Sequence, residues 1–256
     1  MVKPDYMKFL RTETFPTPFC PGCGHGILMG AIARCATEME LDPLRLLFVS
    51  GIGCAAWIPS PHFATDTLHT THGRAIAFAT GAKLFKPALK VVVVSGDGDL
   101  SAIGGNHLIH AARRNIEMTV LCANNSIYGM TGGQAGPTTP TGARTATTPE
   151  GNPERPFDLC RLVYGAGATY VARSTVYHVR HLMKVIKNAL SHKGFAFVDV
   201  VSPCFTQFGR KNKVASASDQ LFGLKEACAT VDGLAGLAED RQADKIAIGE
   251  FTARKE

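Results

Sequence analysis

The run of four valines from Val91 to Val94, followed after Ser95 by glycine, is the feature that most limits how this chain can fold. A short, continuously apolar run of this kind is typical of a parallel strand that is buried on both faces. Similar short runs alternate along the chain with segments whose apolar residues recur at helical spacing. The alternation predicts an α/β fold, with a mostly parallel sheet and helices on both faces. We expect helices over 26–40, 75–85, 103–114 and 176–192, and strands over 46–50, 90–95, 118–123 and 196–202.

Domain organisation follows from the strength of these patterns. With 256 residues, 45% of them hydrophobic and 19% charged, the chain can bury a sizeable core. We expect residues 1–210 to form one domain. The weaker patterns at 221–230 and 245–251 predict that residues 211–256 are a C-terminal extension, packed on that domain or on a partner subunit. The segment 128–155, rich in Gly, Thr and Pro, is too long for an ordinary connection and is expected to be a functional loop.

The charge pattern excludes some classes of partner. The net charge is +6, and the basic residues are scattered apart from Arg210, Lys211 and Lys213 and the terminal Arg254 and Lys255. Nucleic-acid-binding proteins show a denser basic stripe, no apolar run is long enough for a bilayer, and residues 1–20 lack an apolar signal core. We therefore expect a cytoplasmic protein that binds neither nucleic acid nor membrane. The mild positive charge suits an acidic protein partner, although a solvated surface without function also explains it.

Polar turns follow two of the expected strands. Gly96–Asp99 (GDGD) comes directly after the valine strand, and Asn124–Asn125 ends the next strand along the chain. Both turns fall at the edge of a parallel sheet where ligands bind, beyond the carboxyl ends of the strands. The glycines let backbone approach a phosphate, and the oxygens of Asp97 and Asn125 are ligands that Mg²⁺ accepts. A Gly-Asp-Gly sequence alone also makes an ordinary turn, but together with the asparagine pair it predicts a clamp for a magnesium diphosphate.

The cysteines suggest a second metal site. Eight cysteines in a chain without a secretory signal are better explained as thiols or metal ligands than as disulfides. Cys20 and Cys23 form a CxxC pair, which by itself is compatible with zinc, a redox dithiol or an iron–sulfur cluster. Cys54 and Cys204 each follow a strand directly, so we expect these four thiols to form one site, the alternative being scattered core cysteines. Cys35, Cys122 and Cys160 lie in apolar helix or strand patterns, and Cys228 lies in a weak helical pattern. All four are predicted to be small buried hydrophobic residues.

Seven motifs occur in order along the chain: CPGCGH, GIGC, HTTHGRA, GDGD, IGGNHLIHAARRN, NNSIYGMTGGQ and SPC. The GDG…NN pattern resembles the thiamine diphosphate-binding domain of that enzyme superfamily. The full set resembles the β subunits of 2-oxoacid:ferredoxin oxidoreductases, over roughly Phe19 to Cys204. The resemblance implies a thiamine diphosphate-binding fold in which Cys20, Cys23, Cys54 and Cys204 carry a [4Fe–4S] cluster close to the thiamine ring.

The resemblance also implies roles for individual residues. Mg²⁺ would be held by Asp97, Asn125 and the backbone carbonyl of Ile127. Contacts with the thiamine cofactor would come from Ile52, Gly53, Cys54, Ala55, His72, Gly96, Asp97, Gly98, Asp99, Asn125, Gly129 and Met130. His72 would reach the diphosphate, although it would also serve as a local backbone cap. The candidate catalytic residues are His25, near the thiazolium, and Trp57, which is either a wall of the substrate pocket or ordinary core.

The implied activity is oxidative decarboxylation of a 2-oxoacid, or its reductive reversal, with coenzyme A as co-substrate and ferredoxin as electron acceptor. The glutamate that activates thiamine is expected from a separate α subunit, so the isolated chain is predicted to be inactive; γ and δ subunits are further candidate partners. Relatives often carry a basic residue shortly after the cluster cysteine, where this chain has Cys54-Ala-Ala-Trp57. The runs 66–74 and 128–134 look most like the 2-oxoglutarate branch, which we favour over pyruvate or branched-chain 2-oxoacids.

Two rival interpretations remain open at this stage. One is a thiamine-dependent lyase or synthase without a cluster, in which Cys20 and Cys23 are incidental. The other is a non-catalytic subunit that holds zinc in its CxxC site.

Overall fold

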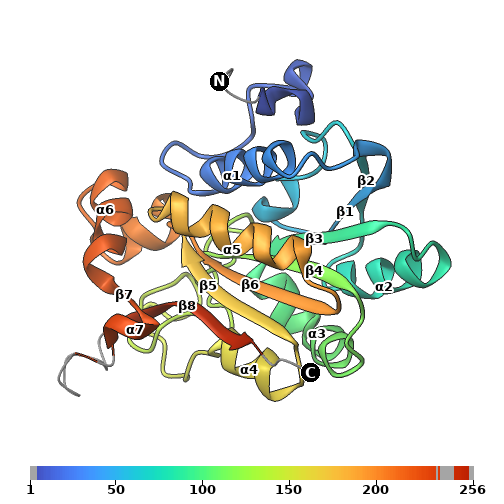
Figure 1. Ribbon diagram of the computed structural model, residues 1–256. Coiled ribbons are helices and arrows are strands. Elements are labelled where there is room, and N and C mark those ends of the chain that lie inside the picture. The colour runs from blue at the N-terminus through green and yellow to red at the C-terminus, as the bar shows by residue number, and fades with distance from the viewer. Residues whose placement is uncertain (1–4, 235, 237–244, 254–256) are drawn as a thin grey trace.

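The fold is a single eight-stranded sheet with helices on both faces (Figure 1), as a computed structural model covering residues 5–234, 236 and 245–253 describes it. The strands, in chain order, are β1 (Leu46–Ser50), β2 (Asp66–His69), β3 (Lys90–Gly96), β4 (Met118–Asn124), β5 (Tyr170–Thr175), β6 (Phe195–Val201), β7 (Cys228–Thr230) and β8 (Ile246–Ala253). They lie side by side in the order β2-β1-β3-β4-β6-β5-β8-β7. The strands from β2 to β5 in this order pair in parallel, whereas β8 runs antiparallel to β5.

The helices are α1 (His25–Glu38), α2 (Ala75–Phe85), α3 (Gly105–Arg113), α4 (Leu159–Gly165), α5 (Val179–Ser191), α6 (Ala217–Ala227) and α7 (Val231–Leu234). Single 3-10 turns occupy Tyr6–Phe9, Thr12–Thr14, Pro43–Arg45 and Cys54–Trp57, and π-helical turns occupy Asp99–Ile103 and Phe205–Gly209. None of the helices within the described ranges is long and apolar enough to cross a bilayer.

Successive side chains of a strand point to opposite faces of the sheet, so the core forms two layers. In β3, Val92 and Val94 point into the layer beneath α1 and α5, whereas Val91 and Val93 point into the layer beneath α2, α3 and α4. All four valines are at most 2% exposed. Because both faces of the strand are covered, an unbroken apolar run is what such a strand needs.

The predicted elements are found in the structure. The boundaries of most of them are shifted by a few residues. The helix expected from residue 103 begins only at Gly105, because the chain first makes the π-helical turn Asp99–Ile103. Sequence analysis missed β2, α4, β5, β7 and α7. The helix and strand patterns after residue 210 correspond to α6 and β8, and β8 extends the same sheet, while the division of the chain at residue 210 stays a prediction.

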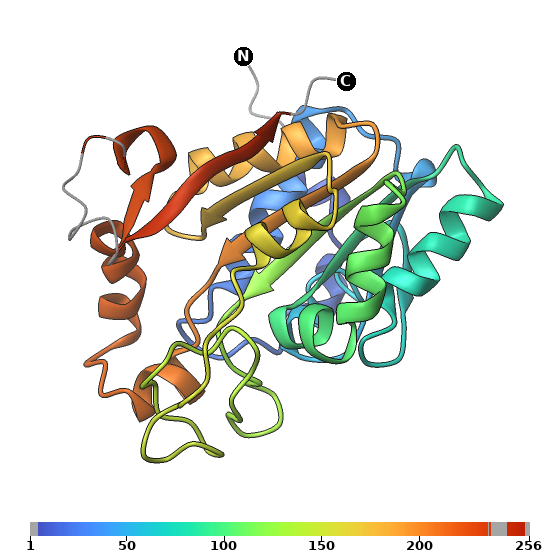
Figure 2. The same ribbon diagram turned by 90° about the horizontal axis from the view of Figure 1, so that it is seen from below.

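The order of the strands decides where the polar turns lie. β1, β3, β4 and β6 are consecutive neighbours in the sheet. The segments that follow them carry, respectively, Cys54, Asp97, Asn125 and Cys204. Parallel pairing brings all four to one edge. The loop of residues 125–158 extends beyond this edge (Figure 2).

A buried ion-pair network supports this edge from within the sheet. Arg173 on β5, whose side chain is 12% exposed, donates to Asp199 on β6 (2.8 Å) and to Asp158 at the start of α4 (2.6 Å). Asp199 also accepts a hydrogen bond from the Asn124 side chain at 3.0 Å. Burial alone would raise the pKa of Asp158, but Arg173 outweighs that effect and lowers it. The network thereby fixes Asn124, which directly precedes the predicted magnesium ligand Asn125.

We expect Arg173→Met to lower the free energy of unfolding by about 3–5 kcal/mol at pH 7, because it leaves the buried Asp199 without its cation. Arg161→Met removes an exposed partner of the same Asp158 and should stay within about 0.5 kcal/mol of the parent. The pKa of Asp158 is lowered in the folded protein, so its pairing stabilises above the ordinary carboxyl pKa and is lost as the pH falls through the lowered value. The difference between parent and Arg173→Met, measured by chemical denaturation, should therefore shrink in acid. Equal losses for both variants at pH 7 would contradict the assignment.

Candidate functional site

Two cavities adjoin at the carboxyl edge of the sheet. The first lies among the segments that follow β1, β3 and β4 and the turn at His72. The second lies among the CxxC segment, the turn after β1, the loop after β4 and the segment after β6. Cys54, Asn125, Gly129 and Met130 line both cavities, so that a ligand in one lies next to a ligand in the other.

The first cavity gathers the residues that sequence analysis assigned to thiamine and magnesium. They are Ile52, Gly53, Cys54, Ala55, His72, Gly96, Asp97, Gly98, Asp99, Asn125, Ile127, Gly129 and Met130. His25, the candidate catalytic histidine, lines it as well. Trp57 lines neither cavity: it is 39% exposed and lies against His69, with ring centroids 6.3 Å apart. The interpretation of Trp57 as buried core is therefore wrong, and a place in the wall of either cavity is not seen.

Asp97 forms the acidic centre of the first cavity. Its Oδ1 accepts from the backbone N–H of Asn125 at 3.4 Å, and its Oδ2 accepts from the hydroxyl of Thr138. Asn125 in turn holds the backbone N–H of Ile127 with its Oδ1 at 3.2 Å, which fixes the turn that carries the Ile127 carbonyl. Burial raises the pKa of Asp97 to about 6 despite these hydrogen bonds. A bound cation would offset this cost of burial, so the donor set fits a hard ion such as Mg²⁺.

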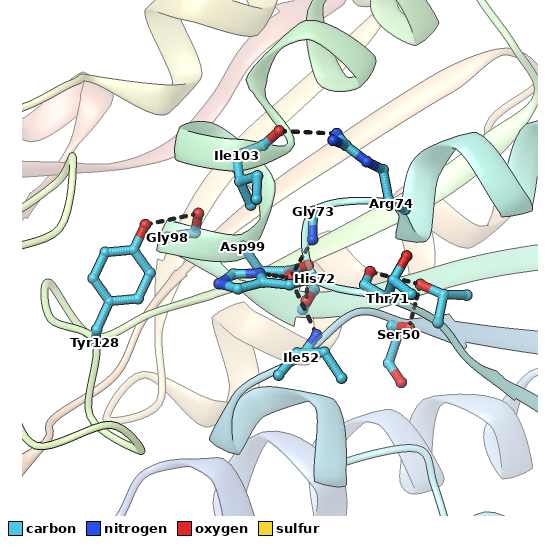
Figure 3. A network of polar contacts seen from close by, with 12 residues as sticks. Ser50, Ile52, Thr71, His72, Gly73, Arg74, Gly98, Asp99, Ile103 and Tyr128 are labelled. Carbon is cyan, nitrogen blue, oxygen red and sulfur yellow. Dashed lines mark hydrogen bonds and ion pairs between the residues drawn. The ribbon is translucent and has the colours of Figure 1, made fainter.

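Asp99 ties three loops together (Figure 3). Its carboxylate accepts from the backbone N–H groups of Ile52 (3.1 Å) and Gly73 (2.8 Å), from Nδ1 of His72 (2.5 Å) and from the hydroxyl of Ser95 (2.7 Å). A side chain at Gly51 would collide with the same carboxylate, so this position requires glycine. Asp99 was predicted to contact the cofactor; it does line the cavity, but its oxygens are engaged in positioning the loops around it.

His72 is oriented by this contact. Because Asp99 holds Nδ1, Nε2 is the ring nitrogen that remains available to a ligand in the first cavity. The geometry therefore differs from that of a local backbone cap, which was the alternative for this residue.

Tyr128 and Thr138 are site residues that sequence analysis missed. The Tyr128 hydroxyl donates to the Gly98 carbonyl at 3.3 Å, and a side chain at Gly98 would collide with the Tyr128 ring. The motif NNSIYGMTGGQ contained Tyr128, so its position close to Asn125 was a usable signal. Thr138 lies in the long loop, and nothing in its local sequence indicates a bond to Asp97.

His25 is fully buried at the start of α1, and neither of its ring nitrogens has a partner among the described residues. Burial lowers the pKa of His25 to about 4, so the imidazole is neutral at pH 7. Buried polar groups are almost always hydrogen-bonded in folded proteins. An unpaired imidazole that lines a cavity is therefore evidence that the cavity holds a polar ligand.

The four predicted cysteine ligands line the second cavity together. The CxxC segment packs against the segment after β6: the Gly24 N–H donates to the Pro203 carbonyl at 3.4 Å, and a side chain at Gly24 would collide with Ser202. On the opposite side, a Cβ atom at Gly129 would lie 3.5 Å from the Sγ atoms of both Cys54 and Cys204. Four segments far apart in sequence thus converge on one cavity.

The four thiols lie close enough together to affect one another's ionisation. Burial, followed by the neighbouring thiols, raises the pKa of Cys23 to about 12 and that of Cys54 to about 11. Across the described ranges, no three side chains of His, Cys, Asp or Glu come close enough together to hold one metal ion. Four thiols that line one cavity would fit either a multi-atom iron–sulfur cluster or a single soft metal ion such as zinc.

The remaining cysteines stay apart from this cavity. Cys35, Cys122 and Cys160 are buried, as predicted. Cys228 is only half-buried and begins β7, so its placement in a helix as a buried residue is wrong.

We expect Asp99→Asn to lower the free energy of unfolding by about 2–3 kcal/mol, because an amide replaces a charged acceptor that holds several donors. Thermal and denaturant unfolding would measure the loss. Asp66→Asn, an exposed aspartate on β2, is the matched control and should leave stability nearly unchanged. Equal losses of stability in the two variants would show that Asp99 does not hold these loops together.

Comparisons with known proteins agree with this geometry. Residues 51–200 match the family described as thiamine pyrophosphate enzyme, C-terminal TPP binding domain. The chain is 48% identical to 2-oxoglutarate synthase subunit KorB of Methanocaldococcus jannaschii over 245 residues, covering 96% of this chain and 90% of that protein. It is 53% identical to KorB of Archaeoglobus fulgidus over 205 residues, covering 80% and 76% of the two chains.

A solved structure is similar over the whole chain. It is a 2-oxoglutarate:ferredoxin oxidoreductase from Magnetococcus marinus with 2-oxoglutarate, coenzyme A and succinyl-CoA bound. The TM-score is 0.87 at 32% identity, and the match covers 100% of this chain and 87% of that one. The fold class and the resemblance predicted from sequence are thereby confirmed. This chain belongs to the thiamine pyrophosphate-binding family that includes the KorB subunits of 2-oxoglutarate synthase and the β subunits of 2-oxoacid:ferredoxin oxidoreductases.

Proposed function

We propose that this chain is the thiamine- and cluster-binding β subunit of a 2-oxoglutarate:ferredoxin oxidoreductase. With its α subunit it converts 2-oxoglutarate and coenzyme A into succinyl-CoA and CO₂, and passes two electrons to ferredoxin, or runs the reverse reaction. The observation that carries this proposal is the shared wall of the two cavities, formed by Cys54, Asn125, Gly129 and Met130. A thiamine cofactor in the first cavity would thus lie next to an iron–sulfur cluster in the second.

The first cavity suits a metal diphosphate at one end. Asp97, Asn125 and the Ile127 carbonyl would hold Mg²⁺, and His72 would present Nε2 to the diphosphate. Gly96 and Gly98 let the backbone approach the phosphates closely. When bound, thiamine diphosphate takes up the negative charge that departing CO₂ leaves on the substrate carbon.

The chain's own residues orient the substrate and exclude water. His25 lies in the buried part of the first cavity, with two ring nitrogens unpaired. Being neutral, it offers one N–H donor and one acceptor to a ligand oxygen without introducing a charge. We assign it a hydrogen bond to the reacting substrate. The role of Trp57 in substrate choice stays a prediction, because Trp57 lies outside both cavities.

The second cavity suits a [4Fe–4S] cluster on Cys20, Cys23, Cys54 and Cys204. Such a cluster accepts electrons one at a time. Cys54 is the ligand that also lines the first cavity, so the path between the two sites is short.

A second subunit is required for the chemistry. The acidic residues among the described lining of the first cavity are Asp97 and Asp99, and both carboxylates are engaged. A free glutamate for activating thiamine must therefore come from outside this lining, which supports an α subunit as the source. Coenzyme A would be the co-substrate, and ferredoxin the electron acceptor.

Anaerobic co-purification with the α subunit tests this function. The complex should contain iron, sulfide and thiamine, and should reduce a viologen with 2-oxoglutarate and coenzyme A, whereas this chain alone should not. A panel with pyruvate and branched-chain 2-oxoacids tests the substrate. A colourless, iron-free complex that decarboxylates a 2-oxoacid would instead indicate a lyase, and zinc without thiamine would indicate a structural subunit.

We expect Asp97→Asn to weaken magnesium-dependent binding of thiamine diphosphate by about 100-fold or more, because the variant loses the only negative charge of the proposed ligand set. Equilibrium binding would measure the effect, with Asp219→Asn on the exposed start of α6 as the control. Iron content should remain that of the parent. Unchanged thiamine affinity would rule out Asp97 as the metal ligand.

Cys204→Ser should abolish the visible absorbance of the cluster and most of the bound iron, because serine cannot replace a thiolate in a four-thiolate site. Cys228→Ser, at a half-buried cysteine outside the cavity, should retain both. Iron and sulfide analysis after anaerobic purification would distinguish the two variants. Full iron content in Cys204→Ser would remove this residue from the ligand set.

A further inference from the structure

The segment that follows Cys204 connects the second cavity to the surface. It forms the π-helical turn Phe205–Gly209, in which Phe205, Thr206 and Gln207 line the second cavity. Arg210 and Lys213, which come directly after this turn, are exposed. The first turn beyond the cluster ligand therefore leads from the cavity wall to a basic surface.

Two hydrogen-bonded contacts hold this basic segment in place. Lys211 donates to Oε1 of Gln207 at 2.8 Å and to the Gly132 carbonyl at 3.4 Å. The Asn212 side chain accepts from the Arg144 N–H at 2.8 Å and donates to the Arg144 carbonyl at 3.0 Å. The long loop after β4 and the segment after β6 thus lie side by side, as Figure 2 shows. Arg144, also exposed, is brought next to a segment that is distant in sequence.

These four residues, Arg144, Arg210, Lys211 and Lys213, form the basic patch. None of them takes part in an ion pair among the described residues, and Arg210 lies over the ring of Phe205, 5.6 Å from its centroid. The acidic residues on the same segments are Glu150, Glu154 and Asp158 in the loop, of which Asp158 is paired with Arg173, and Asp219 and Glu226 on α6, of which Asp219 accepts from Ser216. Along residues 205–216, which follow Cys204 directly, every charged side chain is basic. The terminal Arg254 and Lys255 lie outside the described residues.

We propose that the basic patch is the docking surface for an acidic iron–sulfur electron carrier. This inference rests on the proposed function, because it requires a redox cluster in the second cavity. The step itself forms and breaks no bond: one electron leaves the reduced cluster for the oxidised carrier, and two carriers are reduced for each 2-oxoacid oxidised. A surface of opposite charge beside the donor steers the carrier to the position where its own cluster comes closest.

The test uses the complex with the α subunit and the charge-reversal variant Arg210→Glu/Lys213→Glu, which leaves the cavity-lining residues untouched. The matched control is Lys86→Glu/Arg114→Glu, which reverses two exposed charges at the C-terminal ends of α2 and α3, at the opposite edge of the sheet. The probe is an acidic bacterial-type ferredoxin. Its dissociation constant is measured at low and at high salt, together with ferredoxin reduction and viologen reduction.

The patch variant should bind ferredoxin at least about tenfold more weakly at low salt, and the difference should shrink at high salt because salt screens exposed charges. Its viologen reduction and iron content should match those of the parent, and the control variant should resemble the parent throughout. If the patch variant bound ferredoxin as tightly as the parent while both still reduced viologen, the patch would not be the docking site. Failure of the parent to reduce viologen would instead count against the proposed function, and ferredoxin binding would still decide whether the patch is a docking surface.

Discussion

Parallel hydrogen bonding between β1, β3, β4 and β6 is the constraint on which the site depends. It aligns the four strands so that they end at one edge, and the chemistry-bearing turns follow immediately. The two proposed metal sites would then draw on single residues from separate segments: Asp97 and Asn125 for one, Cys54 and Cys204 for the other. Neither site needs a long binding loop of its own, because the sheet supplies the alignment.

Buried charged groups fix the positions of the turns that follow the strands. Asp99 fixes the His72 turn to the turns after β1 and β3. Arg173 fixes Asp199, which holds Asn124 beside the predicted magnesium ligand Asn125. Each charged group has several partners, which is the condition under which a buried charge is tolerated. These networks stiffen the cavity walls without occupying the space in which ligands would lie.

Local rules predicted the buried strands from their apolar runs, and pointed to Asp97 and Asn125 from the glycines and polar residues at the strand ends. The resemblance to a known family supplied most of the other site residues. The structure gathers them around two cavities, and their roles stay predictions. Local rules failed where the structure is decided by distant partners. β2 is a short edge strand with two exposed residues, and β5 contains Arg173, whose charge is matched only by Asp199 and Asp158. The hydrogen bond of Thr138 and the loop-tying role of Asp99 are likewise long-range contacts. Cys228 was misplaced because a weak helical pattern ended at the start of β7.

Gly129 is one of the four residues that line both cavities, and at this position the shared wall consists of backbone alone. A Cβ atom there would lie 3.5 Å from the sulfur atoms of Cys54 and Cys204. The separation of the two cavities at this point is therefore set by the main chain. A substitution elsewhere in the lining can change the shape of either cavity and leave this spacing unchanged.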